Sequence, residues 1–131
     1  MTITLAEAEK LLQAAKAKAR EMGIPVSIAV VDPRGDLVAV ARQDGARWTT
    51  PEIARGKAVA SATFGVPSGE LAERANSPVM RSVMLMQGGR FIPHQGALPI
   101  KRSNQVIGAV GVSGGTSQQD EEVAQAGIDA L

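Results

Sequence analysis

The sequence predicts an α+β domain in which helices pack on an antiparallel sheet. Two pairs of apolar segments, at 26–43 and 93–113, are each joined by a short polar turn, which is typical of β-hairpins. Helical periodicity marks segments before, between and after these hairpins. The regular alternation of strand and helix that builds a doubly wound parallel sheet is missing.

The first helix is predicted from Thr4 onward. Thr4 and Glu7 have the spacing of a capping box, and apolar residues then recur every three or four positions up to Met22. Gly23 and Pro25 end the pattern.

The segments VSIAVVD (26–32) and LVAVARQ (37–43) predict the first hairpin, with a turn at 33–36. Both are apolar on two faces, so the sheet is expected to be covered on both sides. Asp32 and Asp36 flank the turn, and Asx-type bonds to the backbone explain them better than a catalytic carboxylate pair does.

The second helix is predicted from Thr50, with Pro51 at its first positions, to Phe64. A short helix at 68–76 follows. The segment SVMLMQG (82–88) predicts a strand.

The second hairpin is predicted from the apolar stretches around 97–101 and 105–113, with a turn at 102–105 between them. A final helix is predicted from about Ser117. The chain of 131 residues is therefore expected to form one domain, 1–131, with a single core.

Composition excludes several classes of function. The net charge is +1 and no long basic run occurs, so neither a nucleic-acid surface nor a membrane surface is expected. Cysteine is absent, which excludes disulfides, thiolate metal sites and a cysteine nucleophile. No signal peptide or transmembrane stretch is recognisable, so the expected location is the cytoplasm.

Lys57 and His94 are the strongest single candidates for chemistry. Lys57 falls in the helical stripe that should face the sheet, so its ammonium either reaches the helix edge or is paired or faces a ligand. His94 is the only histidine and lies in a predicted loop, where an imidazole could bind iron or transfer a proton. A lone surface histidine without such a role is equally ordinary.

Positively charged residues surround the same region. Arg81, Arg90 and Lys101 could hold a carboxylate near His94, although solvated strand ends would explain them as well. Three methionines in VMRSVMLM could line an apolar pocket or simply fill the core.

The glycine-rich turn GVSGGT (111–116) leads from a strand into the last helix. Its amides could converge on an anion, but Asp120 and the two glutamates after it already occupy the first helical turn. The segment matches neither the P-loop nor the dinucleotide-binding pattern, and Ser113 is not in a nucleophile elbow. Nucleotide binding and serine hydrolysis are therefore disfavoured.

Three segments together resemble the GlcG/HbpS haem-binding family, which also includes the C-terminal domain of PduO-type proteins. They are AVVDPRGDLVAVARQDGA (29–46), ARGKAVASATFGVPSGEL (54–71) and VIGAVGVSGGTSQQDEEVAQAGIDAL (106–131). The resemblance implies a profilin-like fold with a five-stranded antiparallel sheet flanked by helices. It also implies a homo-oligomer, from dimer to octamer.

The resemblance further implies a haem- or tetrapyrrole-binding protein. His94 is then the expected axial ligand of the haem iron, and Arg81, Arg90 or Lys101 would neutralise the propionates. The turn residues Ser113, Gly114, Gly115 and Thr116 are expected in the pocket wall.

Two alternatives stay open. One is an enzyme of small-molecule catabolism acting on an anionic metabolite, an organic acid or an aromatic ring-cleavage product. His94 or Lys57 would then be the general acid or base, and the amides of the turn would hold the anion. The other alternative is a non-catalytic accessory module.

Overall fold

The structure is a computed structural model that describes residues 1–131. The elements follow in the order α1 (Leu5–Met22), β1 (Ser27–Val31), β2 (Leu37–Arg42), α2 (Thr50–Phe64), the 3₁₀ helix η1 (Ser68–Arg74), α3 (Pro78–Met86), β3 (Ala97–Arg102), β4 (Gln105–Ser113) and α4 (Ser117–Asp129). Four of these are strands, and they pair antiparallel in the order β2-β1-β4-β3. The α+β class predicted from the sequence is confirmed.

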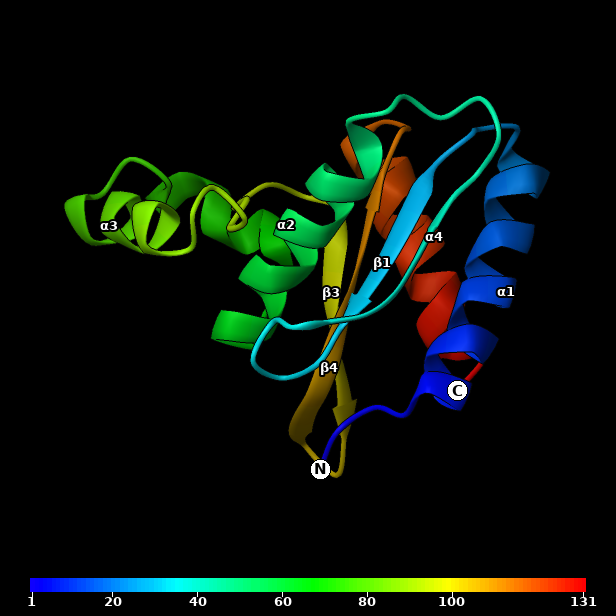
Figure 1. Cartoon of the computed structure of the whole chain (residues 1–131), viewed down its shortest axis with the longest axis horizontal. Helices are drawn as coiled ribbons and strands as arrows, with labels where there is room; N and C mark the ends of the chain where they lie inside the picture. The colour runs from blue at the N-terminus through cyan, green and yellow to red at the C-terminus, as the bar shows by residue number, and fades with distance from the viewer.

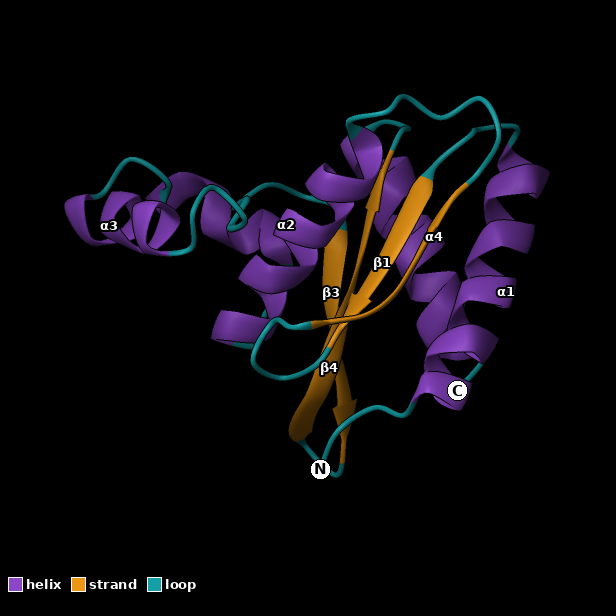
Figure 2. Cartoon of the chain, in the orientation of Figure 1, coloured by secondary structure: helices purple, strands orange, loops and turns teal.

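Helices cover both faces of the sheet, and each face has its own apolar core (Figures 1 and 2). Between α1, α4 and one face lies the larger core, which includes Leu11, Ile28 and Val123. Between α2 and the other face lies the smaller one, which includes Val31, Ala58 and Phe91. Every residue of β1 is buried, as expected for a strand covered on two sides.

The local signals at the ends of α1 are confirmed. Thr4 Oγ1 accepts a hydrogen bond from the amide of Glu7 at 3.1 Å, and the amide of Thr4 donates to Glu7 Oε1 at 3.0 Å. Gly23 ends the helix in a left-handed conformation with φ 71°.

The prediction of five strands is wrong, because the segment 82–88 belongs mainly to helix α3. Ser77 caps that helix by accepting a bond from the amide of Met80 at 3.2 Å, and Pro78 occupies its first turn. Met and Leu are good helix formers, and apolar periodicity in so short a run does not separate strand from helix. Helix α3 projects away from the sheet (Figure 1).

None of the helices combines the length and the apolar character that crossing a membrane requires.

Candidate functional site

A buried ion pair lies between α2, β4 and α4. Lys57 Nζ is 3.1 Å from Asp120 Oδ2 and donates to the carbonyl of Val112 at 3.0 Å. Both charged side chains are only 4% exposed. Of the alternatives considered for Lys57, the structure therefore shows the paired side chain.

This pair also leaves little room around the ammonium. A Cβ atom on Gly96 would lie 2.7 Å from Lys57 Nζ and 2.9 Å from the carbonyl oxygen of Val112. Gly96 also has φ 140°, a backbone conformation that L side chains rarely adopt. The ammonium is thus enclosed by protein atoms, which fits a structural clamp better than a free general base.

The turn between β4 and α4 is largely saturated by its own helix. The amide of Gly115 donates to Asp120 Oδ1 at 2.8 Å, and the amide of Thr116 donates to Gln119 Oε1 at 2.9 Å. Thr116 Oγ1 in turn accepts from the amide of Gln119 at 3.2 Å. The N-terminus of α4 is therefore capped from within.

His94 lies in the loop before β3, and its ring is exposed. Its Nε2 is 3.0 Å from the hydroxyl of Ser117 at the start of α4. The backbone beneath it is fixed by the buried Ser68 in η1. Ser68 Oγ donates to the carbonyl of His94 at 2.6 Å and accepts from the amide of Ala97 at 3.0 Å.

Two open clefts lie near His94 and β3. One cleft of about 500 Å³ contains His94, and a second of about 500 Å³ contains Lys101. Pro67 and Glu70 line both, so the two clefts adjoin, and together they are called the groove below. Apolar residues line the second part: Val66, Pro67, Leu98, Pro99 and Ile128.

The structure brings together only some of the predicted binding residues. His94 and Lys101 share the groove. Arg81, in α3, and Arg90, in the loop after it, are exposed and line neither cleft. Glu121 lines only the part that contains His94, whereas Glu70 lines both parts.

The methionine-rich segment is divided between the core and the surface. Met80 is buried in the core beneath α2, and Met84 packs against that core, while Met86 is 76% exposed. The interpretation of these residues as core is confirmed for Met80.

The predicted role of Asp32 in its turn is also confirmed. Asp32 Oδ1 accepts from the amides of Arg34 at 2.8 Å and Asp36 at 3.0 Å.

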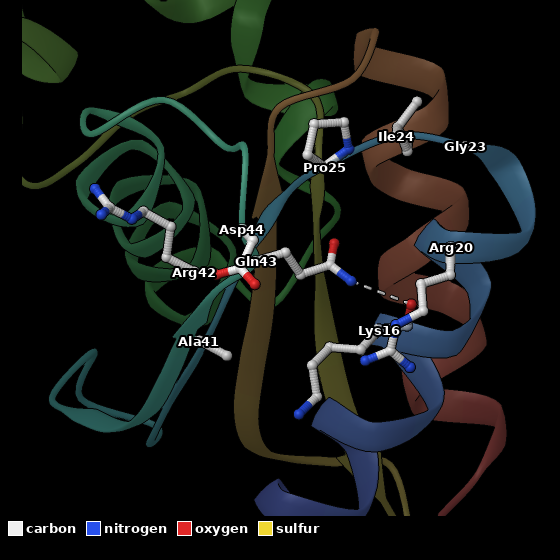
Figure 3. A pocket seen from close by; sticks show the side chains of 9 residues that line it. All are labelled: Lys16, Arg20, Gly23, Ile24, Pro25, Ala41, Arg42, Gln43 and Asp44. Carbon is white, nitrogen blue, oxygen red and sulfur yellow. Dashed lines mark hydrogen bonds between the residues drawn. The ribbon is translucent and has the colours of Figure 1, made fainter.

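A basic cleft of about 450 Å³ lies between α1 and the edge strand β2 (Figure 3). Lys16, Arg20 and Arg42 line it, together with Asp44. In Figure 3 the Arg42 side chain extends away from Lys16 and Arg20, so the cations do not converge on one point. Gln43 crosses the cleft, accepting from the amide of Val26 at 3.1 Å and donating to the carbonyl of Lys16 at 3.4 Å.

Two residues that fix the loop of His94 and the basic cleft could not be recognised from the sequence. Ser68 and Gln43 bridge segments that are 26 to 29 and 17 to 27 positions away. Neither residue belongs to a local motif. For Ser68, the proline directly before it, Pro67, indicated a constrained backbone.

A sequence model of the HbpS-like family, described as "Haem degrading protein HbpS-like", matches residues 3–129. An uncharacterised 15.0 kDa protein from the dhaT-dhaS intergenic region of Citrobacter freundii is 36% identical over 131 residues, covering 99% of this chain and 92% of that protein. The corrinoid adenosyltransferase PduO of Citrobacter freundii is 26% identical over the whole chain, which spans 39% of that enzyme.

Solved structures with the same fold include a protein called ORFY from Klebsiella pneumoniae. It is 34% identical with a TM-score of 0.91, and the match covers 99% of this chain and 90% of that one. The complex of PduOC with haem is 25% identical with a TM-score of 0.88, covering 100% and 96%. HbpS of Streptomyces reticuli, solved as a double mutant, is 30% identical with a TM-score of 0.87, covering 100% and 88%.

Proposed function

Because the chain belongs to the HbpS-like family, we propose that it binds haem or a related tetrapyrrole in the groove between His94 and Lys101. The observation that carries the proposal is the likeness, over the whole chain, to a structure solved with haem. The adenosyltransferase activity of the longer PduO is not part of it.

The residues of the groove fit such a ligand. The His94 imidazole is accessible, and its Nε2 faces a hydroxyl and not a carboxylate that would hold it in place. Val66, Leu98 and Pro99 offer apolar contact to a flat ring. No cluster of three or more His, Cys, Asp or Glu side chains could hold a free metal ion, so iron would depend on the macrocycle.

The charged residues differ between the two parts of the groove. Lys101 lines the cleft along β3, Glu121 lines the cleft that contains His94, and Glu70 lines both. Propionates are therefore favoured near Lys101, and Glu121 disfavours them near His94. A bound haem would supply a redox-active iron at the imidazole.

Titration of the purified protein with hemin tests the proposal. We expect a saturable Soret band, and His94→Ala should shift the band and weaken binding about tenfold or more. Lys101→Met should weaken binding with the band position unchanged, because it removes only a charge. Lys10→Met, an exposed lysine on α1, is the matched control.

The possible results distinguish haem binding itself from the assignment of His94 as the iron ligand. A wild-type protein that gives no saturable band removes haem binding altogether. A band of the same position and affinity in His94→Ala would instead remove only the assignment of the ligand.

We also propose that the protein forms a homo-oligomer. Helix α3 exposes three large apolar side chains: Val79 is 69% exposed, Leu85 82% and Met86 76%. Clustered apolar side chains of this kind commonly mark a protein interface. Burial of α3 between subunits would explain why a helix that projects from the sheet exposes these three side chains.

A further inference from the structure

A separate cleft of about 440 Å³ lies where the first turn of α2 meets the end of β4. Residues of the loop after β2 and of the turn from β4 to α4 line it. Both segments lie at the top of Figure 1. It shares no lining residue with the groove of His94.

The hydroxyl of Ser113 is a polar group without a partner in this cleft. Ser113 is only 7% exposed, lines the cleft, and its hydroxyl forms no hydrogen bond to protein. Two neighbouring hydroxyls differ in this respect. Thr50 Oγ1 donates to the carbonyl of Arg47 at 2.7 Å, so Ser27 Oγ must donate to Thr50 Oγ1 at 2.8 Å.

Ser113 lies on the same face of the sheet as Ser27, because the two residues are paired across β4 and β1. This face is the one against which α2 packs. The strand thus holds the Ser113 hydroxyl beside the start of α2, where it is available to donate to a molecule in the cleft.

The N-terminus of α2 adds donors and a positive field to the same cleft. Its N-cap residue, Thr49, makes no side-chain cap bond and has helical backbone angles of −78° and −20°. The amide of Glu52 has no backbone acceptor. An uncapped helix start of this kind attracts anions, in contrast with the N-terminus of α4, which Thr116 and Gln119 close.

From these features we propose that the cleft binds the carboxylate of a small organic acid. Arg47, which lines the cleft and is exposed, supplies the countercharge, and a guanidinium matches a carboxylate in geometry. The Ser113 hydroxyl donates to the same carboxylate. Pro25 and Ile53 line the remaining volume and would contact the apolar body of the acid.

The charge balance favours a carboxylate over a phosphate. Arg47 is the only charged residue that lines the cleft, and the Glu52 carboxylate is in the first turn of α2. Pro51 also removes one amide from that turn. With one arginine and one glutamate near the cleft, a ligand with a single negative charge is expected to bind better than a ligand with two.

Sodium butyrate and inorganic phosphate are suitable probes, followed through the backbone amide resonances of ¹⁵N-labelled protein. We expect butyrate to cause saturable shifts at Glu52, Ser113 and Gly114 that sodium chloride at equal ionic strength does not reproduce. Ser113→Ala should weaken binding about tenfold, since the lost bond is to a charged group. Arg47→Gln should weaken it at least as much.

Two control variants make the result specific. Arg34→Gln removes an exposed arginine of the β1–β2 turn and should leave butyrate binding unchanged. His94→Ala should also leave it unchanged, so failure of this site and failure of haem binding are distinguishable. Because Arg47 is exposed, Arg47→Gln is expected to fold even if Ser113→Ala does not.

Three results would overturn the proposal. They are the absence of saturable shifts with butyrate, wild-type affinity in Arg47→Gln, and tighter binding of phosphate than of butyrate.

Discussion

Lys57 and Asp120 are the two ionisable residues that the protein buries. A charge without its partner is expensive inside a protein, so the two side chains depend on each other. Lys57 also donates to the carbonyl of Val112, and Asp120 accepts from the amide of Gly115. The pair therefore joins α2 to the end of β4 and the start of α4.

Lys57→Met should lower the free energy of unfolding by about 3–5 kcal/mol, because it leaves Asp120 buried without a counterion. Urea denaturation measures this change. Lys18→Met is the matched control, since Lys18 forms a surface pair with Glu21 at 3.6 Å, and it should change stability by at most about 1 kcal/mol. A loss in Lys57→Met as small as in the control would contradict the structural role.

Glu7 gives the protein a pH-dependent contact at the start of α1. Its pKa is lowered, first by the backbone hydrogen bond from Thr4 and then by the side chain of Arg102. A depressed carboxyl pKa stabilises the fold above the pKa of the unfolded chain, and this contribution is lost as the pH falls through the folded value.

Glu7→Gln should therefore lower the melting temperature at neutral pH and flatten its dependence on pH in the acid range. Thermal unfolding of both proteins from neutral to acid pH measures the effect. Glu9→Gln, at an exposed position on the same helix, is the control. Parallel pH profiles for wild type and Glu7→Gln would argue against the contribution of Glu7.

At the scale of elements, Gly111 allows α2 to lie directly on β4. A Cβ atom at this position would come within 2.0 Å of the carbonyl oxygen of Ala54 and 2.8 Å of the amide of Ala58. Both obstacles are backbone, which cannot rotate away. The close approach also brings Lys57 within reach of the Val112 carbonyl.

Gly111→Ala should destabilise the protein by about 3 kcal/mol or more, the upper end of the range for overpacked cores. Gly115→Ala is the comparison, because an added Cβ would meet the flexible ends of Ile24 and Gln119 at 2.9 Å and 3.0 Å. Its cost should be smaller. Chemical denaturation of both variants tests the difference, and equal costs would show that α2 can shift away from the sheet.

At the scale of the whole molecule, we expect substitutions on the projecting helix α3 to affect assembly most. Leu85→Lys places a charge at a side chain that is 82% exposed, so the fold of the subunit should be unaffected. If α3 lies between subunits, the charge would be buried on assembly and the oligomer should dissociate. Light scattering coupled to size exclusion measures the mass.

Gln13→Lys, which adds the same charge at an exposed position on α1, is the control. An unchanged mass for Leu85→Lys would place the interface elsewhere or show a monomer.

The sequence by itself determined the α+β class, both hairpins and the ends of α1, because capping, turns and periodicity are local properties of the chain. It did not determine the secondary structure of residues 82–88, since a short apolar run fits either a strand or a helix. There Ser77 and Pro78 begin a helix, and no neighbouring strand pairs with the segment.

Only the tertiary structure decided which candidate residues lie together. Lys57 meets Asp120 across 63 positions, Ser68 fixes the loop of His94 across 26, and Ser113 faces the start of α2. No local pattern records such distances, because they depend on strand register and on how closely α2 approaches β4. For the same reason His94 and Lys101 share a groove while Arg81 and Arg90 lie outside it.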